Sequence, residues 1–223
     1  MVRQTPPDPS VAIHVENAMP FAKKISAACL LSLLLFAVPA RPSENFAGHI
    51  LGGPAQAPVR IEVYSDFECP HCRDLYLTVI RQILQDYPNK VCIVYHEFPI
   101  SSHRYSQEAA RYSEAAFRMG QQTMLKVFDA LFLDQANWSQ TGRMDQAIAK
   151  VMPREELQTL KRIMQDPGVN VEVEKEKQQG MQIGIDSTPT LFIYYYGRQQ
   201  RVDTREGPIS YPVMKQFLNS VLK

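Results

Sequence analysis

The sequence predicts an α/β fold in which a small sheet is built from two halves of the chain with a long helical segment between them. Residues 59–98 show a strand, helix and strand pattern in that order. From about residue 106 to 182 the spacing of apolar residues is only helical, and strand patterns return near residue 190. A strand–helix–strand unit with one crossover makes its two strands parallel, with a right-handed connection.

The first half of the chain carries three expected elements. Residues 59–64 alternate in polarity and are rich in β-branched side chains, which predicts a strand. Helical spacing follows from Cys69 to about Asp86, and Pro88 ends it. The apolar run over residues 92–98 then predicts a second, buried strand.

The middle of the chain is expected to be helical throughout. Apolar residues at a spacing of three to four predict one helix over residues 109–116 and a second over 124–132. A third helix can begin at Pro153. The last helix follows the break at Asp166-Pro167-Gly168 and ends near Gly184. Residues 172–177, which are mostly charged, are interpreted as a solvated face of that last helix.

The second half of the sheet is expected near the C-terminus. Residues 190–196 form an aromatic strand pattern, Gly197-Arg198 a turn and residues 201–204 a returning antiparallel strand. Residues 211–222 then close the chain with an amphipathic helix.

The N-terminal region has the pattern of a secretory signal peptide. Lys23 and Lys24 form a positive segment, residues 25–38 are apolar, and Val38-Pro39-Ala40 has small residues at the spacing of a cleavage site. The apolar run is shorter than the roughly 20 residues that a membrane span needs. An uncleaved N-terminal anchor is the alternative interpretation.

This pattern predicts the domain organisation. Residues 1–40 are expected to be the signal peptide, with Met19 as a candidate true start. Residues 41–223 are expected to form one folded domain with the helical insertion at about 106–182, and residues 41–58 are a polar lead-in rich in Gly and Pro. The predicted location is the periplasm or cell envelope.

Charge and cysteine content limit the expected partners and the candidate reactive residues. The chain has 24 Lys and Arg against 23 Asp and Glu, a net charge of +1, so neither nucleic acid nor an anionic membrane surface is an expected partner. Cleavage would remove Cys29 and leave Cys69, Cys72 and Cys92. Cys92 lies in the second predicted strand, where a buried thiol is an inert apolar group.

The remaining pair forms the motif Cys69-Pro70-His71-Cys72, which has several possible uses. Haem attachment would require His rather than Arg73 after the second Cys. A structural zinc site needs four ligands, and His96 and His103 have neither suitable spacing nor a partner that the sequence identifies. A purely structural disulfide across two residues would restrict the unfolded chain very little. No metal or cofactor is therefore expected.

The position of the motif favours redox chemistry. Cys69 falls at the first turn of a predicted helix, where unpaired backbone N–H groups and the helix dipole stabilise a thiolate. Pro70 loses no needed hydrogen bond there, and a protonated His71 adds a positive charge. We expect an exposed Cys69 to be the nucleophile and a more covered Cys72 to resolve the mixed disulfide. An exposed Glu68 would oppose the thiolate only weakly.

The motif with the residues before it resembles the active site of the DsbA-like branch of the thioredoxin superfamily: Tyr64-Ser65-Asp66-Phe67-Glu68-Cys69-Pro70-His71-Cys72. The resemblance implies a thioredoxin-like fold with a helical insertion between a βαβ half and a C-terminal ββα half. Ser187-Thr188-Pro189-Thr190 matches the loop that faces the disulfide in this branch. It implies a cis Pro189, a substrate-binding backbone at Thr188 and Pro189, and a tuning role for His71.

The chain departs from the branch at one position. Several relatives keep a buried acid six residues before the first Cys, and Val63 stands there. Glu62, Asp66 and Glu68 are nearby acids, and the sequence does not show whether any of them handles the proton of Cys72.

The expected function is that of an exported thiol–disulfide oxidoreductase that donates the Cys69–Cys72 disulfide to folding secreted proteins. The alternatives are a disulfide isomerase or reductase with the same chemistry, or a peptide-binding chaperone. The expected partners are reduced secreted polypeptides and a redox partner that reoxidises the disulfide, for which a membrane-bound protein is one candidate. The protein is expected to be a monomer.

Overall fold

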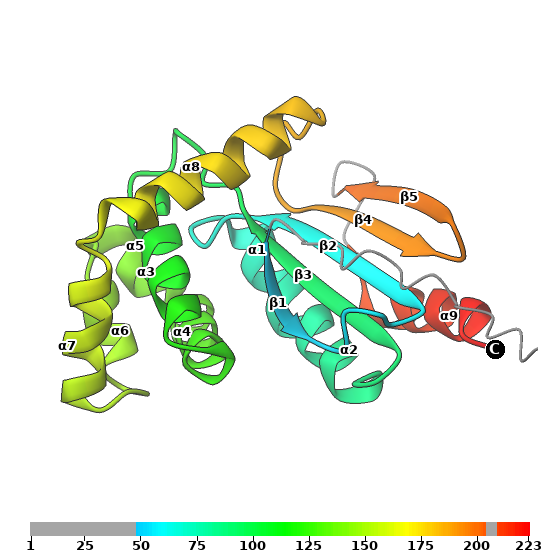
Figure 1. Ribbon diagram of the computed structural model, residues 1–223, viewed down its shortest axis with the longest axis horizontal. Helices are drawn as coiled ribbons and strands as arrows, with labels where there is room; N and C mark the ends of the chain where they lie inside the picture. The colour runs from blue at the N-terminus through cyan, green and yellow to red at the C-terminus, as the bar shows by residue number, and fades with distance from the viewer. Residues whose placement is uncertain (1–47, 204–208) are drawn as a thin grey trace, which may run out of the picture. The chain divides into compact units, whose positions relative to one another are not determined.

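The described residues contain a mixed five-stranded sheet with the spatial order β1-β3-β2-β4-β5 (Figure 1). The computed structural model describes residues 48–203 and 209–223. β2 and β3 are parallel, as the crossover predicts, and the other neighbouring pairs are antiparallel. The strands are β1 (His49–Gly52), β2 (Val59–Ser65), β3 (Val91–Glu97), β4 (Thr190–Tyr195) and β5 (Arg198–Asp203).

β1 is a strand within the segment that we interpreted as a lead-in. It pairs with β3 at the edge of the sheet, with a bulge between Ile50 and Gly52. The chain leaves the strand at Gly53, which has a φ of +78° and lies so close to the Val91 carbonyl that a Cβ would collide with it. A strand of four residues is too short for its alternation to be recognised in the sequence.

The crossover between β2 and β3 is helical, as expected, with one irregularity. It consists of α1 (Pro70–Leu75), a π-helical segment η1 (Tyr76–Ile80) and α2 (Arg81–Asp86). A π-helical turn changes which residues face the sheet without ending the helix. The spacing of apolar residues did not predict this local change.

Helices alone occupy the described chain between β3 and β4, which confirms the predicted insertion between the two halves of the sheet. Asp166 caps the last of them by accepting a hydrogen bond from the Gly168 N–H (2.8 Å). The helices are α3 (Ser106–Arg118), α4 (Gln121–Leu133), α5 (Gln135–Thr141), α6 (Met144–Ile148), α7 (Arg154–Ile163) and α8 (Pro167–Gln182). After β5, α9 (Tyr211–Val221) closes the chain.

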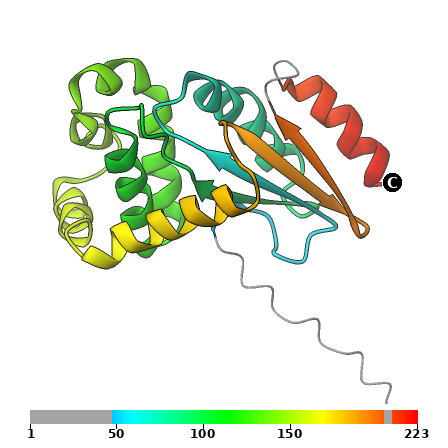
Figure 2. The ribbon, with the colours of Figure 1, turned by 90° about the horizontal axis from the view of Figure 1, so that it is seen from above.

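The two faces of the sheet belong to two different cores because side chains alternate along each strand. Ile61 and Val63 face the larger core, which α1, α2 and α9 cover, whereas Tyr64 faces a smaller cluster on the other side. Gly180 of α8 approaches this second face so closely that a Cβ would lie 2.8 Å from the Phe98 ring. Figure 2 shows α8 on the face opposite α1, α2 and α9.

Two sequence predictions need correction. Within the expected solvated face 172–177, Glu176 is buried, and its Oε2 atom accepts a hydrogen bond from the Glu97 N–H (2.6 Å) because α8 crosses the end of β3. The returning strand begins at Arg198 rather than at residue 201, since the turn is completed at Tyr196 and Gly197, which both have positive φ.

The signal peptide over residues 1–40, the start at Met19 and Cys29 lie outside the described residues, as does Thr204 of the returning strand. Among the helices that are described, none has both the length and the apolar content required to cross a membrane.

Candidate functional site

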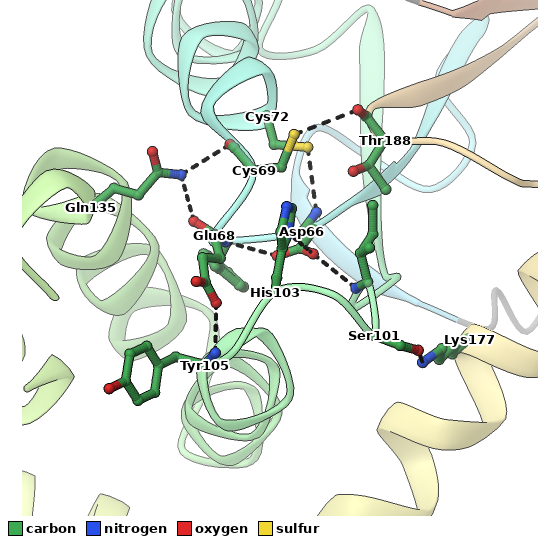
Figure 3. A network of polar contacts seen from close by, with 12 residues as sticks. Asp66, Glu68, Cys69, Cys72, Ser101, His103, Tyr105, Gln135, Lys177 and Thr188 are labelled. Carbon is green, nitrogen blue, oxygen red and sulfur yellow. Dashed lines mark hydrogen bonds and ion pairs between the residues drawn. The ribbon is translucent and has the colours of Figure 1, made fainter. Parts of the chain in front are cut away.

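The two cysteines lie where β2 passes into α1, at the end of the parallel pair of strands (Figure 3). Cys69 is the N-cap residue of α1, with an extended backbone (φ −72°, ψ 121°), and Pro70 occupies the first turn. The N–H groups of this turn have no partner inside the helix and point toward the cap. The sequence prediction that Cys69 stands at a helix N-terminus is confirmed.

The Cys69 thiol is strongly activated by its surroundings, which lower its pKa to about 6. The largest cause is a hydrogen bond from the Cys72 thiol, and burial opposes it. The backbone N–H groups of Cys72 and His71 lower the pKa further. A substantial fraction of Cys69 is therefore thiolate near neutral pH.

The Cys72 thiol has the opposite character. Burial raises its pKa well above that of an ordinary thiol, and the neighbouring Cys69 raises it further because two adjacent thiolates repel each other. The Asp66 N–H donates a hydrogen bond to the Cys72 Sγ (3.4 Å), which favours the thiolate but does not outweigh burial. Cys72 therefore keeps its proton at neutral pH, where a substantial fraction of Cys69 is thiolate.

Accessibility differs from the expectation for one of the two cysteines. Cys69 is only 5% exposed and Cys72 is 1% exposed. Cys69 is therefore the more exposed of the two thiols, as predicted, but it is a buried residue and not an exposed one. His71 is exposed, and the lowering of the Cys69 pKa attributed to it comes from its backbone N–H. The covering of Cys69 comes from a distant loop that the local sequence does not reveal.

That loop carries Thr188 and Pro189. The Cys69 Sγ donates a hydrogen bond to the Thr188 carbonyl oxygen (3.5 Å), and the Thr188–Pro189 peptide bond is cis, as the resemblance implied. The loop leads directly into β4, which pairs with β2. Sheet pairing thus brings the two motifs of the sequence face to face.

Asp66 anchors the segment that precedes Cys69. Its carboxylate is buried and accepts hydrogen bonds from the N–H groups of Glu68 (2.7 Å) and Ile100 (2.8 Å). The Nδ1 atom of His103 lies 2.8 Å from Asp66 Oδ2. His103 therefore has a partner, which the sequence did not identify because the two residues lie in different loops.

A second set of contacts connects the same segment to the helical insertion. The Gln135 side chain, at the start of α5, donates hydrogen bonds to the carbonyl oxygens of Phe67 (2.6 Å) and Cys69 (2.9 Å). Glu68 is partly buried rather than exposed, and its carboxylate accepts a hydrogen bond from the Tyr105 N–H (2.6 Å). Nothing in the local sequence distinguishes Gln135 from the exposed glutamines of the insertion.

The remaining sequence candidates lie apart from the redox pair. His96 belongs to the opposite side of the sheet, where its ring stacks on Tyr64 and its Nε2 atom lies 3.7 Å from Glu62. Cys92 is fully buried in β3, and burial raises the pKa of its thiol to about 11. Within residues 48–203 and 209–223, no group of three or more His, Cys, Asp or Glu side chains is arranged to hold a metal ion.

The combination of a parallel βαβ unit, a Cys pair at the helix N-terminus and a facing cis-Pro loop indicates a protein family. The family model described as thioredoxin matches residues 45–207. The chain belongs to the thioredoxin family. Within it, the chain is a DsbA-like thiol–disulfide oxidoreductase, and the fold class predicted from the sequence is confirmed.

Relatives of this thioredoxin-family chain occur among characterised sequences and structures. It is 24% identical to the disulfide bond formation protein D of Bacillus subtilis over 165 residues, which are 70% of this chain and 72% of that protein. The structure of oxidised BdbD from Bacillus subtilis is similar with a TM-score of 0.64 and 21% identity, covering 79% of this chain and 93% of that one.

A periplasmic thioredoxin-like protein from Salmonella enterica serovar Typhimurium is also similar, with a TM-score of 0.56 and 16% identity. That match covers 81% of this chain and 93% of the Salmonella protein. At these levels of identity the solved structures establish the fold, and the chemistry follows from the thiol pair itself.

Proposed function

We propose that this thioredoxin-family protein is an oxidase that transfers the Cys69–Cys72 disulfide to reduced polypeptides outside the cytoplasm. The observation that carries the proposal is the difference between the two thiols, with a pKa of about 6 for Cys69 and a strongly raised pKa for Cys72. A stabilised Cys69 thiolate is a good leaving group and lowers the free energy of the reduced enzyme. Both effects favour donation of the disulfide to another protein.

The reaction proceeds by two thiol–disulfide exchanges. A client thiolate attacks the Cys69 Sγ, the Cys69–Cys72 bond breaks, and Cys72 leaves with the electron pair and takes up a proton. A second client thiolate then attacks the client sulfur of the mixed disulfide, and Cys69 leaves as a thiolate. The client gains a disulfide, and the two electrons remain on the enzyme as reduced Cys69 and Cys72 until a redox partner removes them.

Each residue of the predicted site has a role in this scheme. Cys69 is the sulfur that the client attacks and that later leaves as a thiolate, and it becomes the nucleophile when the reaction runs in reverse. Cys72 is the first leaving thiol and resolves the mixed disulfide in that reverse direction. Pro70 and His71 shape the helix start, with the exposed His71 ring available to tune the reduction potential. Thr188 and Pro189 present backbone groups to an extended client strand, a form of strand addition. The Thr188 carbonyl, which accepts from Cys69 in this structure, is next to the attacked sulfur.

Export is supported by the N-terminal sequence pattern and by the description of the similar Salmonella protein as periplasmic. An oxidising compartment is where donated disulfides persist. Mass spectrometry of the protein from its native envelope is expected to give a mature N-terminus at or near Arg41. An intact chain with reduced thiols in the cytoplasm would contradict the proposed location.

The reduction potential of the Cys69–Cys72 pair is the decisive measurement. Equilibration with glutathione is expected to give a value nearer to the oxidising limit of about −120 mV than to the reducing value of about −270 mV in this superfamily. Oxidised protein should also introduce a disulfide into a reduced dithiol peptide. Cys92→Ala provides the matched control, because Cys92 is buried away from the pair, and should leave both results unchanged.

Variants of the pair separate the alternatives. Mixed with a client that contains a disulfide, Cys72→Ala should accumulate mixed disulfides on a non-reducing gel, because the Cys69 thiolate attacks the client disulfide and no second enzyme thiol resolves the product. Cys69→Ala should trap none. A potential near the reducing value would instead indicate a reductase or isomerase. Continued folding of a cysteine-free client by Cys69→Ala would indicate a chaperone.

A further inference from the structure

A small cavity lies beside Cys72, between the sheet and the helices of the crossover from β2 to β3. Its volume is about 10 Å³. One water molecule needs a cavity of about 10–15 Å³ and two to four polar partners. The cavity is lined by Val63, Ser65, Cys72, Tyr76 and Tyr95 together with aliphatic side chains.

Three of the lining residues bring polar groups to this otherwise apolar space: Ser65, Cys72 and Tyr95. Tyr95 is 2% exposed, and its hydroxyl makes no hydrogen bond to any of the residues that the structure describes. A buried hydroxyl without a partner is unfavourable, so this group calls for a ligand that both donates and accepts hydrogen bonds. Tyr76 is different, because its hydroxyl donates to Asp129 Oδ1 (3.0 Å).

We propose that one water molecule occupies this cavity, hydrogen-bonded to the hydroxyls of Ser65 and Tyr95, and transfers protons to and from the Cys72 sulfur. Ser65 and Tyr95 are then positioning residues for the proton-carrying water. The inference rests on the proposed role of Cys72 as the resolving thiol, and it identifies how that thiol is protonated.

No described acid lines the cavity. Glu97, two residues after Tyr95 in β3, is buried with a pKa raised well above the usual range, and it also lies outside the lining. Val63, at the position of the acid found in several relatives, contributes only apolar surface to the cavity. The nearby carboxylate of Asp66 is engaged by His103 and by the backbone N–H groups of Glu68 and Ile100. Ser65 lies with Cys72 and Tyr95 in the lining of the cavity, and its proximity to Cys72 counteracts the increase in the Cys72 pKa that burial causes.

This water supplies the proton that Cys72 takes up during the reaction and removes it in the reverse direction. When a client thiolate attacks Cys69, the S–S bond breaks and the electron pair passes to the Cys72 sulfur. The water donates a proton to that sulfur and regains one from solvent, into which the client thiol has released its own. When Cys72 attacks a mixed disulfide, the proton leaves by the same route, and no further oxidant or reductant is involved.

Tyr95→Phe removes the unpaired hydroxyl, and Tyr76→Phe is its matched control within the same cavity wall. Stopped-flow oxidation of a reduced dithiol peptide should be slowed about tenfold by Tyr95→Phe near pH 8, less than the roughly 100-fold or more of a direct general acid, because Tyr95 acts only through the water. The rate of Tyr95→Phe divided by the wild-type rate should approach one near pH 5, where solvent protons are abundant. Tyr76→Phe should follow the wild-type pH profile.

Ser65→Ala provides a second test if Tyr95→Phe does not fold. It should slow the same step with the same pH dependence. Nuclear Overhauser effects between water and the Cys72 and Ser65 amides should be present in the wild type and weaker in Ser65→Ala. Equal pH profiles for all variants, or the absence of a water signal in the wild type, would overturn the inference. A wild-type protein that fails to oxidise the peptide would instead contradict the proposed function.

Discussion

The Nδ1 atom of His103 lies 2.8 Å from the Oδ2 atom of Asp66, and this pair links the loop after β3 to the segment that carries Cys69. Asp66 is the buried member and also accepts two backbone N–H groups, whereas His103 is partly exposed. The pair therefore joins two loops that are far apart in the sequence at the edge of the redox site.

Asp66→Ala should be more destabilising than His103→Ala. Loss of the Asp66 carboxylate leaves the buried N–H groups of Glu68 and Ile100 without their acceptor, at a cost of about 1–3 kcal/mol. Loss of His103 removes one contact from a partly exposed position and should cost less than about 1 kcal/mol. Urea unfolding of both variants measures the difference in the free energy of unfolding. Equal decreases for the two variants would contradict the larger role assigned to Asp66.

Alkylation by iodoacetamide should distinguish the two thiols of the reduced protein. Cys69 should react with a midpoint near its pKa of about 6, and Cys72 should stay unreactive in this range because its pKa is strongly raised. Mass spectrometry of the modified peptides against pH provides the measurement. A Cys69 that reacts no faster than Cys72 at neutral pH would contradict the proposed chemistry.

The same assay should rank the groups that activate Cys69. Cys72→Ala removes the largest cause of the lowered Cys69 pKa, so it should raise the pH midpoint of Cys69 alkylation more than His71→Ala does. His71→Ala keeps its backbone N–H, so it should cause a smaller upward shift. The reverse order would indicate that the His71 ring, and not the Cys72 thiol, is the main source of activation.

Reduced protein should melt at a higher temperature than oxidised protein near neutral pH. The Cys69 pKa falls from an ordinary thiol value of about 8.5 to about 6 on folding. The resulting stabilisation of the reduced form is complete above the unfolded pKa and is lost as the pH falls through the folded pKa. With allowance for solvent screening, we expect about 1 kcal/mol at pH 7. Calorimetry from about pH 5 to about pH 8 should show the difference increasing with pH.

Gln135→Ala should weaken the attachment of the active-site segment to the helical insertion. It removes the donor to two buried carbonyl oxygens, those of Phe67 and Cys69, and should destabilise the fold by about 1–3 kcal/mol. Gln140→Ala, at an exposed position of the same helix, is the matched control and should change stability by less than about 0.5 kcal/mol. Similar losses for both variants would mean that only helix propensity is affected.

Glu97→Gln should stabilise the protein at neutral pH. Glu97 is buried, and burial together with the neighbouring Glu176 raises its pKa well above the usual range. An acid whose folded pKa is raised destabilises the fold as the pH rises through the unfolded value, because the unfolded chain releases the proton more readily. The gain in melting temperature should therefore be larger near pH 8 than near pH 4, whereas the exposed Glu108→Gln should show no such gain.

Local patterns in the sequence determined the order of the elements that follow β1 and the chemistry of the Cys pair. The strand–helix–strand unit around Cys69, the helical insertion and the second pair of strands depend on periodicity and on residues such as Pro70 and Pro167, whose effects are local. The thiolate at a helix N-terminus follows from the same local reasoning, since the helix itself supplies the N–H groups.

Only the tertiary structure decided which groups surround that thiolate. The resemblance had already implied the facing Thr188–Pro189 loop, but the Asp66–His103 pair, the Gln135 contacts and the cavity beside Cys72 all depend on segments that are distant in sequence. Hydrogen bonds between loops and the removal of groups from water are set by how the sheet and the insertion pack. A single sequence contains no periodicity that reports such contacts, so the identity of the reactive residues was predictable and the tuning of their environment was not.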